Sequence, residues 1–250
     1  MAGKAAQHPQ AGMVVIGNEI LTGKVTDTNS PFLCKELNFL GLELARITTI
    51  GDDFATIGRV VREFSEAYTW VFTSGGIGPT HDDITVKAVA GGFGVEAVRH
   101  PKLEEALRAH YQERLTEDHL LMALVPEGAE LVEIPGWSFH QVLFRNIFIL
   151  PGVPQLFQHR FHAFKHRFQG QPLLLKELFL KADEGTIAAA LRDAAERFPG
   201  VMIGSYPDFS NKEYSVKVTV EAREQDLLGA AVSELQEKLA ALPITIVRVE

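Results

Sequence analysis

Between residues 13 and 93 the chain alternates short apolar runs with stretches of helical periodicity, and this alternation restricts the possible folds most strongly. Residues 13–17, a short apolar run, and residues 42–50 and 70–73 predict strands. The segments between them, residues 30–40 and 57–67, carry apolar side chains three and four positions apart and predict helices. Strand–helix–strand order of this kind specifies a parallel sheet with helices on both faces.

Three polar loops follow the predicted strands, at residues 18–29, 51–53 and 74–83. In open parallel sheets, ligands bind beyond the carboxyl ends of the strands. We therefore expect the three loops to converge on one site at that edge of the sheet.

The chain is expected to comprise a disordered tail, residues 1–12, an α/β domain, residues 13–170, and a small α+β domain, residues 171–250. The last of these follows the β-α-β-β-α-β order of a ferredoxin-like domain. Its strands are expected at residues 173–182, 202–206, 213–222 and 244–249, and its helices at residues 184–198 and 226–242.

Three further segments complete the pattern. Residues 101–141 are expected to be irregular apart from a helix over residues 102–114. Residues 146–150 predict a buried strand that ends at the sequence PGVP, where two prolines stop the strand or line a pocket. Residues 204–214 predict a hairpin. The alternative is a lid that reaches over the site of the first domain with Tyr206, Asp208, Asn211 and Lys212.

The bulk properties exclude several classes of protein. A net charge of −8 without any basic run argues against a nucleic-acid partner, since phosphate backbones are neutralised by clustered Lys and Arg. The single cysteine, Cys34, allows no intramolecular disulfide, and the histidines lack the spacing of a zinc site. No apolar run approaches the roughly 18 residues of a membrane span, and the first 12 residues lack a signal-peptide core. We expect a cytoplasmic protein with no membrane partner.

The segment SGGIGPTHDDIT, which begins at Ser74, is the most informative one for function. Its glycines allow close approach of a ligand to the backbone, and Pro79 stiffens the loop. Free N–H groups at the start of the following helix are typical of a phosphate site. The predicted ligand-binding residues of this loop are Ser74, Gly75, Gly76, Gly78, Pro79 and Thr80.

Two adjacent carboxylates, Asp82 and Asp83, follow the glycines. Thr80 or either aspartate is a candidate helix cap. Capping does not explain both aspartates, because a second carboxylate would repel a phosphate unless a cation lay between them. We therefore predict that Asp82 and Asp83 bind a divalent metal, Mg²⁺, Mn²⁺ or Co²⁺, and are catalytic.

The other two loops supply further candidates. Asn18, Glu19 and Asn29 are predicted ligand-binding residues, although turn formation, with Asn29 or Ser30 as a helix cap, would explain the same loop. Asp52 and Asp53 are predicted to assist catalysis, and their alternative role is to cap the next helix.

Together the segments GNEILTGKVTDTNS, IGDD, TSGGIGPTHDDIT and ILPGVP resemble the molybdopterin-binding-like domain of the CinA family. They are more similar still to the equivalent domain at the front of animal-type FAD synthases. The similarity continues through KELFLKADEGTIAAAL and GSYPDFSNKEYSVKVTVEA, and so covers most of the chain. The resemblance implies a MogA/MoaB-like three-layer α/β/α fold with a mostly parallel sheet.

The resemblance also implies a function. It places the binding loop at residues 74–83 and a second acidic position at Asp52 or Asp53, and it implies metal-dependent cleavage of the pyrophosphate in FAD, ADP-ribose or a similar dinucleotide. The alternatives are a molybdopterin-binding protein of molybdenum cofactor synthesis and a non-catalytic nucleotide-binding module. Relatives of this kind form dimers or trimers, so a homo-oligomer is expected. No segment resembles an amidase or a nucleotidyl-transfer domain, so neither deamidation nor FAD synthesis is expected of these residues.

Overall fold

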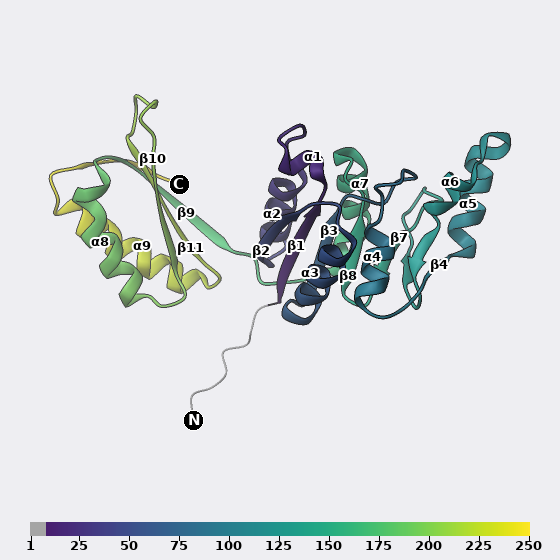
Figure 1. Cartoon of the computed structure of the whole chain (residues 1–250). Coiled ribbons are helices and arrows are strands. Elements are labelled where there is room, and N and C mark those ends of the chain that lie inside the picture. The colour runs from purple at the N-terminus through teal and green to yellow at the C-terminus, as the bar shows by residue number, and fades with distance from the viewer. Residues whose placement is uncertain (1–8) are drawn as a thin grey trace. The chain divides into compact units, whose positions relative to one another are not determined.

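The computed structural model describes residues 9–250, which form two compact units (Figure 1). Unit 1 ends at Gly170, and unit 2 comprises Gln171–Glu250. Residues 1–8 of the predicted tail lie outside the described residues. Residues 10–12 belong to strand β1 (Gln10–Ile16), and Ala11 is buried in it beside Trp70, so the prediction of a tail up to residue 12 was wrong at these positions.

Unit 1 contains a six-stranded sheet in the order β2-β1-β3-β8-β7-β6. The pairings among β2, β1, β3 and β8 are parallel, and the pairings β8–β7 and β7–β6 are antiparallel. The strands after β1 are β2 (Glu43–Ile50), β3 (Trp70–Ser74), β6 (Glu130–Val132), β7 (Gln141–Phe144) and β8 (Ile147–Leu150). The predicted mostly parallel sheet is confirmed.

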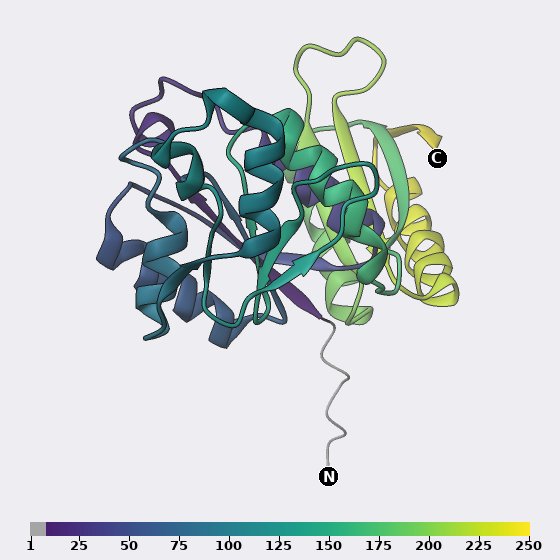
Figure 2. The same ribbon diagram turned by 90° about the vertical axis from the view of Figure 1, so that its right-hand side faces the viewer.

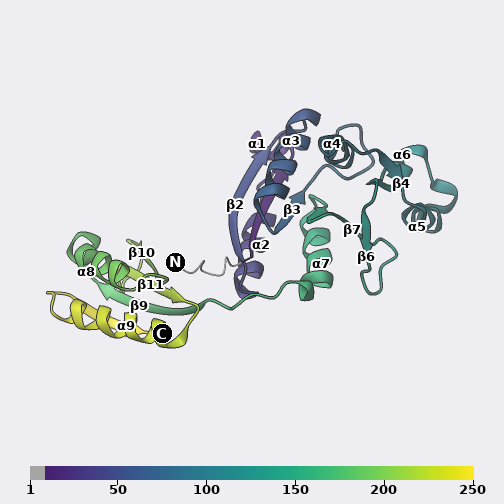
Figure 3. The same cartoon turned by 90° about the horizontal axis from the view of Figure 1, so that it is seen from below.

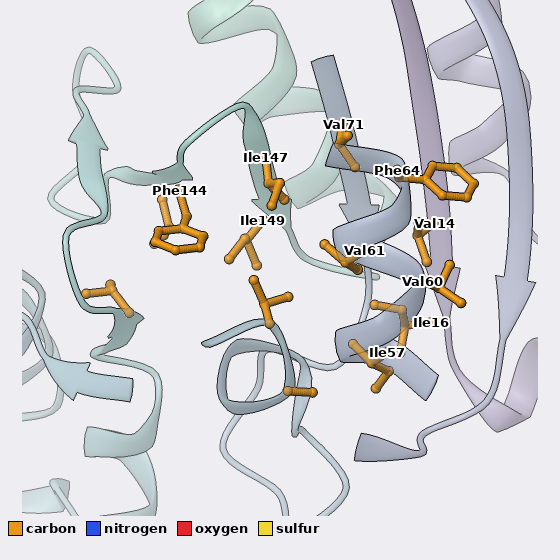
Figure 4. Close-up of a cluster of buried hydrophobic side chains, with 14 of the residues drawn as sticks. Val14, Ile16, Ile57, Val60, Val61, Phe64, Val71, Phe144, Ile147 and Ile149 are labelled. Carbon is orange, nitrogen blue, oxygen red and sulfur yellow. The ribbon is translucent and has the colours of Figure 1, made fainter. Parts of the chain in front are cut away.

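Helices cover both faces of this sheet because alternate side chains of each strand point to opposite sides. Val14 and Ile16 of β1 enter one core, and Met13 and Val15 enter the other. Figure 4 shows the first core, where α3 packs its apolar face against β1, β3 and β8. The helices are α3 (Phe54–Ala67) and α4 (Thr85–Gly92) on the first face, and α2 (Asn29–Phe39) and α7 (Pro154–Phe164) on the second.

The expectation of an irregular region over residues 101–141 was largely wrong. Three or four residues are too few to show a strand period, so the short strands here escape sequence patterns. The region and its borders form β4 (Ala97–Arg99), α5 (Pro101–Tyr111), α6 (Glu117–Leu121), β5 (Leu124–Pro126), β6 and β7. A 3₁₀ turn, Gln112–Arg114, ends the predicted helix, and β4, α5 and α6 lie together at one end of unit 1 (Figure 3).

Three helix starts test the capping predictions. Asp53 caps α3 as predicted, since its side chain accepts a hydrogen bond from the N–H of Thr56 at 2.8 Å. Helix α2 begins at Asn29, and the side chain of Asp27 accepts the N–H groups of Asn29 and Ser30, so neither of these two residues is the cap. Helix α4 begins at Thr85 without a side-chain cap, so the predictions of a cap at positions 80, 82 and 83 were wrong.

Unit 2 has a four-stranded antiparallel sheet in the order β10-β11-β9-β12, with α8 and α9 on one face (Figure 1). This is the predicted ferredoxin-like arrangement. The predicted hairpin joins β10 and β11, and its loop projects beyond the sheet (Figure 2). The elements are β9 (Leu174–Lys181), α8 (Glu184–Arg197), β10 (Met202–Pro207), β11 (Val216–Ala222), α9 (Gln225–Ala240) and β12 (Thr245–Val249).

Candidate functional site

A pocket of about 630 Å³ opens in unit 1 at the carboxyl ends of β1, β3 and β8. Its wall includes Ile16, Ser74 and Pro151, the residues at or directly after those strand ends. Small-molecule sites have volumes of about 300–1,000 Å³. The loops that follow β1 and β3 both line the pocket, whereas residues 51–53, which follow β2, do not.

The backbone of the glycine loop forms one side of the pocket. Gly75 has φ of 111° and Gly76 has φ of 65°, and a Cβ on Gly75 would lie 2.1 Å from the carbonyl oxygen of Ile16. The N–H groups of Gly76, Ile77 and Gly78 donate no hydrogen bond to any residue in the described part of the chain. Successive N–H groups of this kind form an anion-binding concavity.

Asp83 and Thr85 hold the loop in this shape. One carboxylate oxygen of Asp83 accepts the N–H of Thr80 at 2.9 Å and its hydroxyl at 2.6 Å. The hydroxyl of Thr85 donates to the carbonyl of Gly75 at 3.0 Å, and the N–H of Thr85 donates to the carbonyl of Gly76. Among residues 9–250, the second oxygen of Asp83 has no hydrogen-bond partner.

Asn29 connects three segments that are distant in the sequence. Its buried side-chain NH₂ donates to the hydroxyl of Ser74 at 2.9 Å and to the carbonyl of Gly152 at 2.8 Å. Its side-chain oxygen is buried and has no partner within residues 9–250. Asn29 therefore fixes the relative position of the three loops and leaves an acceptor at the pocket wall.

The predicted site residues divide into two groups. Those that line the pocket are Glu19, Asn29, Ser74, Gly75, Gly76, Gly78, Pro79 and Asp83. Those that do not are Asn18, Asp52, Asp53, Thr80 and Asp82. Several of the second group have structural contacts: Asp52 accepts the backbone N–H of Asn18 at 2.9 Å, Asp53 caps α3, and Thr80 binds Asp83.

Three carboxylates lie on the pocket wall, from Glu19, Asp27 and Asp83. Asp27 was not among the predicted ligand residues. One of its oxygens holds the start of α2, and the other has no partner in the described residues. Over residues 9–250 no three or more His, Cys, Asp or Glu side chains form a group that could hold a metal ion. A metal bound here would therefore take the rest of its coordination from water or from oxygen atoms of the ligand.

Basic and apolar residues that sequence patterns did not identify complete the wall. Lys87 comes from α4, His140 precedes β7, and Arg160 comes from α7. Phe139 and Met122 contribute apolar surface. The sequence holds one indication that Leu156 and Arg160 belong together: they are four residues apart and therefore share a face of α7.

Comparisons with known proteins agree with this fold. The family described as a probable molybdopterin binding domain matches residues 12–174, and the family described as the middle domain of FAD synthase matches residues 172–247. A probable FAD synthase of Caenorhabditis elegans is 34% identical over 94% of this chain and 50% of its own length. Protein TK1472 of Thermococcus kodakarensis is 34% identical over 86% of this chain and 96% of its own.

Among solved structures, CinA from Thermoplasma acidophilum has a TM-score of 0.59 and 30% identity, over 64% of this chain and 98% of that chain. The chain spans about half the length of the Caenorhabditis relatives that it matches. Within residues 9–250 there is no helix with the length and apolar character of a membrane span. Similarity to CinA and to part of the FAD synthases accompanies the family match over most of unit 1, and the chain belongs to the probable molybdopterin binding domain family.

Proposed function

We propose that the pocket of unit 1 binds a phosphate-bearing nucleotide or pterin, and that the protein hydrolyses the pyrophosphate of FAD, ADP-ribose or a similar dinucleotide. The observation that carries the proposal is the glycine loop on the pocket wall. Three successive backbone N–H groups there, at Gly76, Ile77 and Gly78, have no acceptor in the described residues. Buried or half-buried backbone N–H groups normally find a partner, and phosphate oxygens would provide one.

A divalent metal would fit the carboxylates of this wall. Asp83 and Asp27 each use one oxygen to hold a loop and keep the other free of hydrogen bonds within the described chain. Phosphate oxygens of the ligand would supply further ligands, as they do in many magnesium sites. When bound, the ion would offset the pyrophosphate charge and lower the pKa of a water molecule.

The glycine loop has its own part in this reaction. Charge develops on the phosphoryl oxygens as the bond between the phosphates breaks, and fixed N–H donors stabilise such charge without reorganisation. Gly75 and Gly76 hold those donors in a conformation that other residues rarely adopt. The similarity to FAD synthases supports a dinucleotide of the FAD class as the ligand.

Two observations favour other functions. The description of the family that matches residues 12–174 favours a molybdopterin ligand, and the corresponding protein would act in molybdenum cofactor synthesis. The absence of a metal-binding group of three side chains over residues 9–250 favours a module that binds a nucleotide without turnover.

The test is release of AMP from FAD, ADP-ribose, NAD and dinucleoside polyphosphates with Mg²⁺, Mn²⁺ or Co²⁺. We expect metal-dependent release that Asp83→Asn reduces at least about 100-fold, the scale for loss of a catalytic electrostatic group. Asp82→Asn is the matched control, because Asp82 is the exposed neighbour outside the pocket wall. Equal activity in wild type and Asp83→Asn would refute the catalytic role of Asp83, and a loss confined to Asp82→Asn would transfer that role to Asp82.

If the folded protein releases no AMP with any metal, calorimetric titration with FAD, ADP-ribose and molybdopterin separates the two remaining functions. Binding of molybdopterin alone would support the cofactor-synthesis protein. Binding of a nucleotide without hydrolysis would support the non-catalytic module.

A further inference from the structure

Helix α7 presents two chemically different faces. Phe157, Phe161 and Phe164 are fully buried in the core between this helix and the sheet. Leu156 and Arg160, one helical turn apart, line the pocket. The three buried phenylalanines anchor the helix. A residue on its pocket face is therefore held in position before any ligand binds.

Arg160 has no carboxylate partner in the described part of the chain. One terminal nitrogen, Nη1, donates to the carbonyl of His140 at 3.3 Å and to the side-chain oxygen of Gln141 at 3.4 Å, both of them neutral acceptors at long distance. The Nε atom is buried and has no hydrogen-bond partner among residues 9–250. Most donors of this guanidinium are therefore unused.

The charge of Arg160 persists despite this environment. Burial lowers the pKa of Arg160 to about 10, so the side chain remains protonated at neutral pH. A buried cation without a counter-ion is unfavourable for the folded protein. An anion that entered the pocket would supply the missing partner, and a guanidinium is suited to phosphate because its donors form a planar fork.

His140 lies beside this arginine and is also incompletely paired. Its Nδ1 atom is buried and has no partner in the described chain, while its carbonyl accepts the hydrogen bond from Arg160. Both side chains line the pocket, and they come from α7 and from the residue before β7. The glycine loop lies between two other elements, β3 and α4, so Arg160 and His140 enter the pocket wall from a different part of the fold.

We propose that Arg160 and His140 form a second phosphate subsite of the pocket, which receives the second phosphate of a pyrophosphate-linked ligand while the glycine loop holds the first. The proposal rests on the proposed function, and it makes that function more specific. A ligand with one phosphate would leave Arg160 unpaired, whereas a dinucleotide would neutralise it.

The test uses inorganic pyrophosphate and orthophosphate as probes, with the chelator EDTA present, and compares wild type with Arg160→Met. Arg59→Met is the matched control, because Arg59 is exposed on α3 and outside the pocket wall. In calorimetric titrations we expect wild type and Arg59→Met to bind pyrophosphate more tightly than orthophosphate. Arg160→Met should lose about 10- to 100-fold in pyrophosphate affinity, which is the range for charge-assisted hydrogen bonds, and the preference for pyrophosphate should disappear.

A second measurement separates a binding role from a structural one. Without any ligand, the melting temperature of Arg160→Met should equal or exceed that of wild type, because an unpaired buried charge has been removed. A lower melting temperature together with unchanged pyrophosphate affinity would show that Arg160 is structural and overturn the proposal. The proposal would also be overturned if Arg160→Met lost the same factor in affinity for pyrophosphate and for orthophosphate, or if wild type did not bind pyrophosphate.

These results are distinguishable from those that test hydrolysis. Absence of AMP release with an Arg160-dependent preference for pyrophosphate would refute the proposed reaction and keep the subsite. Normal AMP release by Arg160→Met, with an unchanged KM for ADP-ribose, would refute the subsite and keep the reaction.

Discussion

Asn29→Ala should weaken unit 1 because it removes a side chain that joins three loops. The substitution deletes two hydrogen bonds, to the hydroxyl of Ser74 at 2.9 Å and to the carbonyl of Gly152 at 2.8 Å. Each such bond contributes about 1 kcal/mol, and an acceptor or donor left unpaired in a buried position costs more than that. Because Asn29 lines the pocket, water can replace part of the lost pairing, so the expected loss is about 2–3 kcal/mol.

The loss is measured by urea unfolding followed through tryptophan fluorescence. Both tryptophans of the chain, Trp70 and Trp137, lie in unit 1, so the signal reports this unit. A loss of this size corresponds to a decrease of roughly 4–12 °C in melting temperature for a unit of this length. Asn38→Ala is the matched control, since Asn38 lies exposed on the same helix.

The result that would refute this reasoning is an Asn29→Ala stability within about 0.5 kcal/mol of the Asn38→Ala stability, the usual range for surface substitutions. In that case the hydrogen bonds of Asn29 would not be what fixes the three loops, and its place in the candidate site would need another explanation.

Two further substitutions test the loop and the cap. Gly75→Ala should lower the melting temperature and abolish pyrophosphate binding in calorimetry, because its Cβ would overlap the carbonyl of Ile16; wild-type affinity would contradict the proposed shape of the loop. Asp53→Ala should lower the melting temperature at pH 7, because the side-chain and backbone hydrogen bonds of Thr56 lower the pKa of Asp53. The ionised carboxylate of Asp53 contributes fully to stability above its pKa in the unfolded chain, near 3.8. This contribution is lost as the pH falls through the lower pKa of Asp53 in the folded protein. The difference between variant and wild type should therefore shrink at acidic pH, and a difference that is constant from pH 7 to pH 3 would exclude the carboxylate as its source.

The mostly parallel sheet and the ferredoxin-like order could both be predicted from local patterns. The strands β1, β2 and β3 have five or more residues each, and the helical patterns between them help to identify them. The capping role of Asp53 was also predictable, since a cap acts over three residues. Strands β6 and β7 were missed because three or four residues show no period and because their register depends on pairing with distant segments.

The candidate site was only partly predictable for the same reason. The glycine loop is a local motif, and its positive φ angles follow from residues that tolerate them. By contrast, the chemistry of an aspartate depends on which atoms surround it. Asp52 holds the backbone of Asn18 and Asp53 caps a helix, whereas Asp83 lies on the pocket wall.

The sequence by itself determined the order of strands and helices, the position of the glycine loop and the acidic character of the region around it, because these properties depend on neighbours a few positions apart. Only the tertiary structure decided which polar groups share the pocket. Asn29, Asp83 and Arg160 are separated by many residues and meet because the ends of β1, β3 and β8 lie side by side and α7 packs on the sheet. Burial and pairing, which give each of these side chains its chemistry, arise from that packing and have no local signature in the sequence.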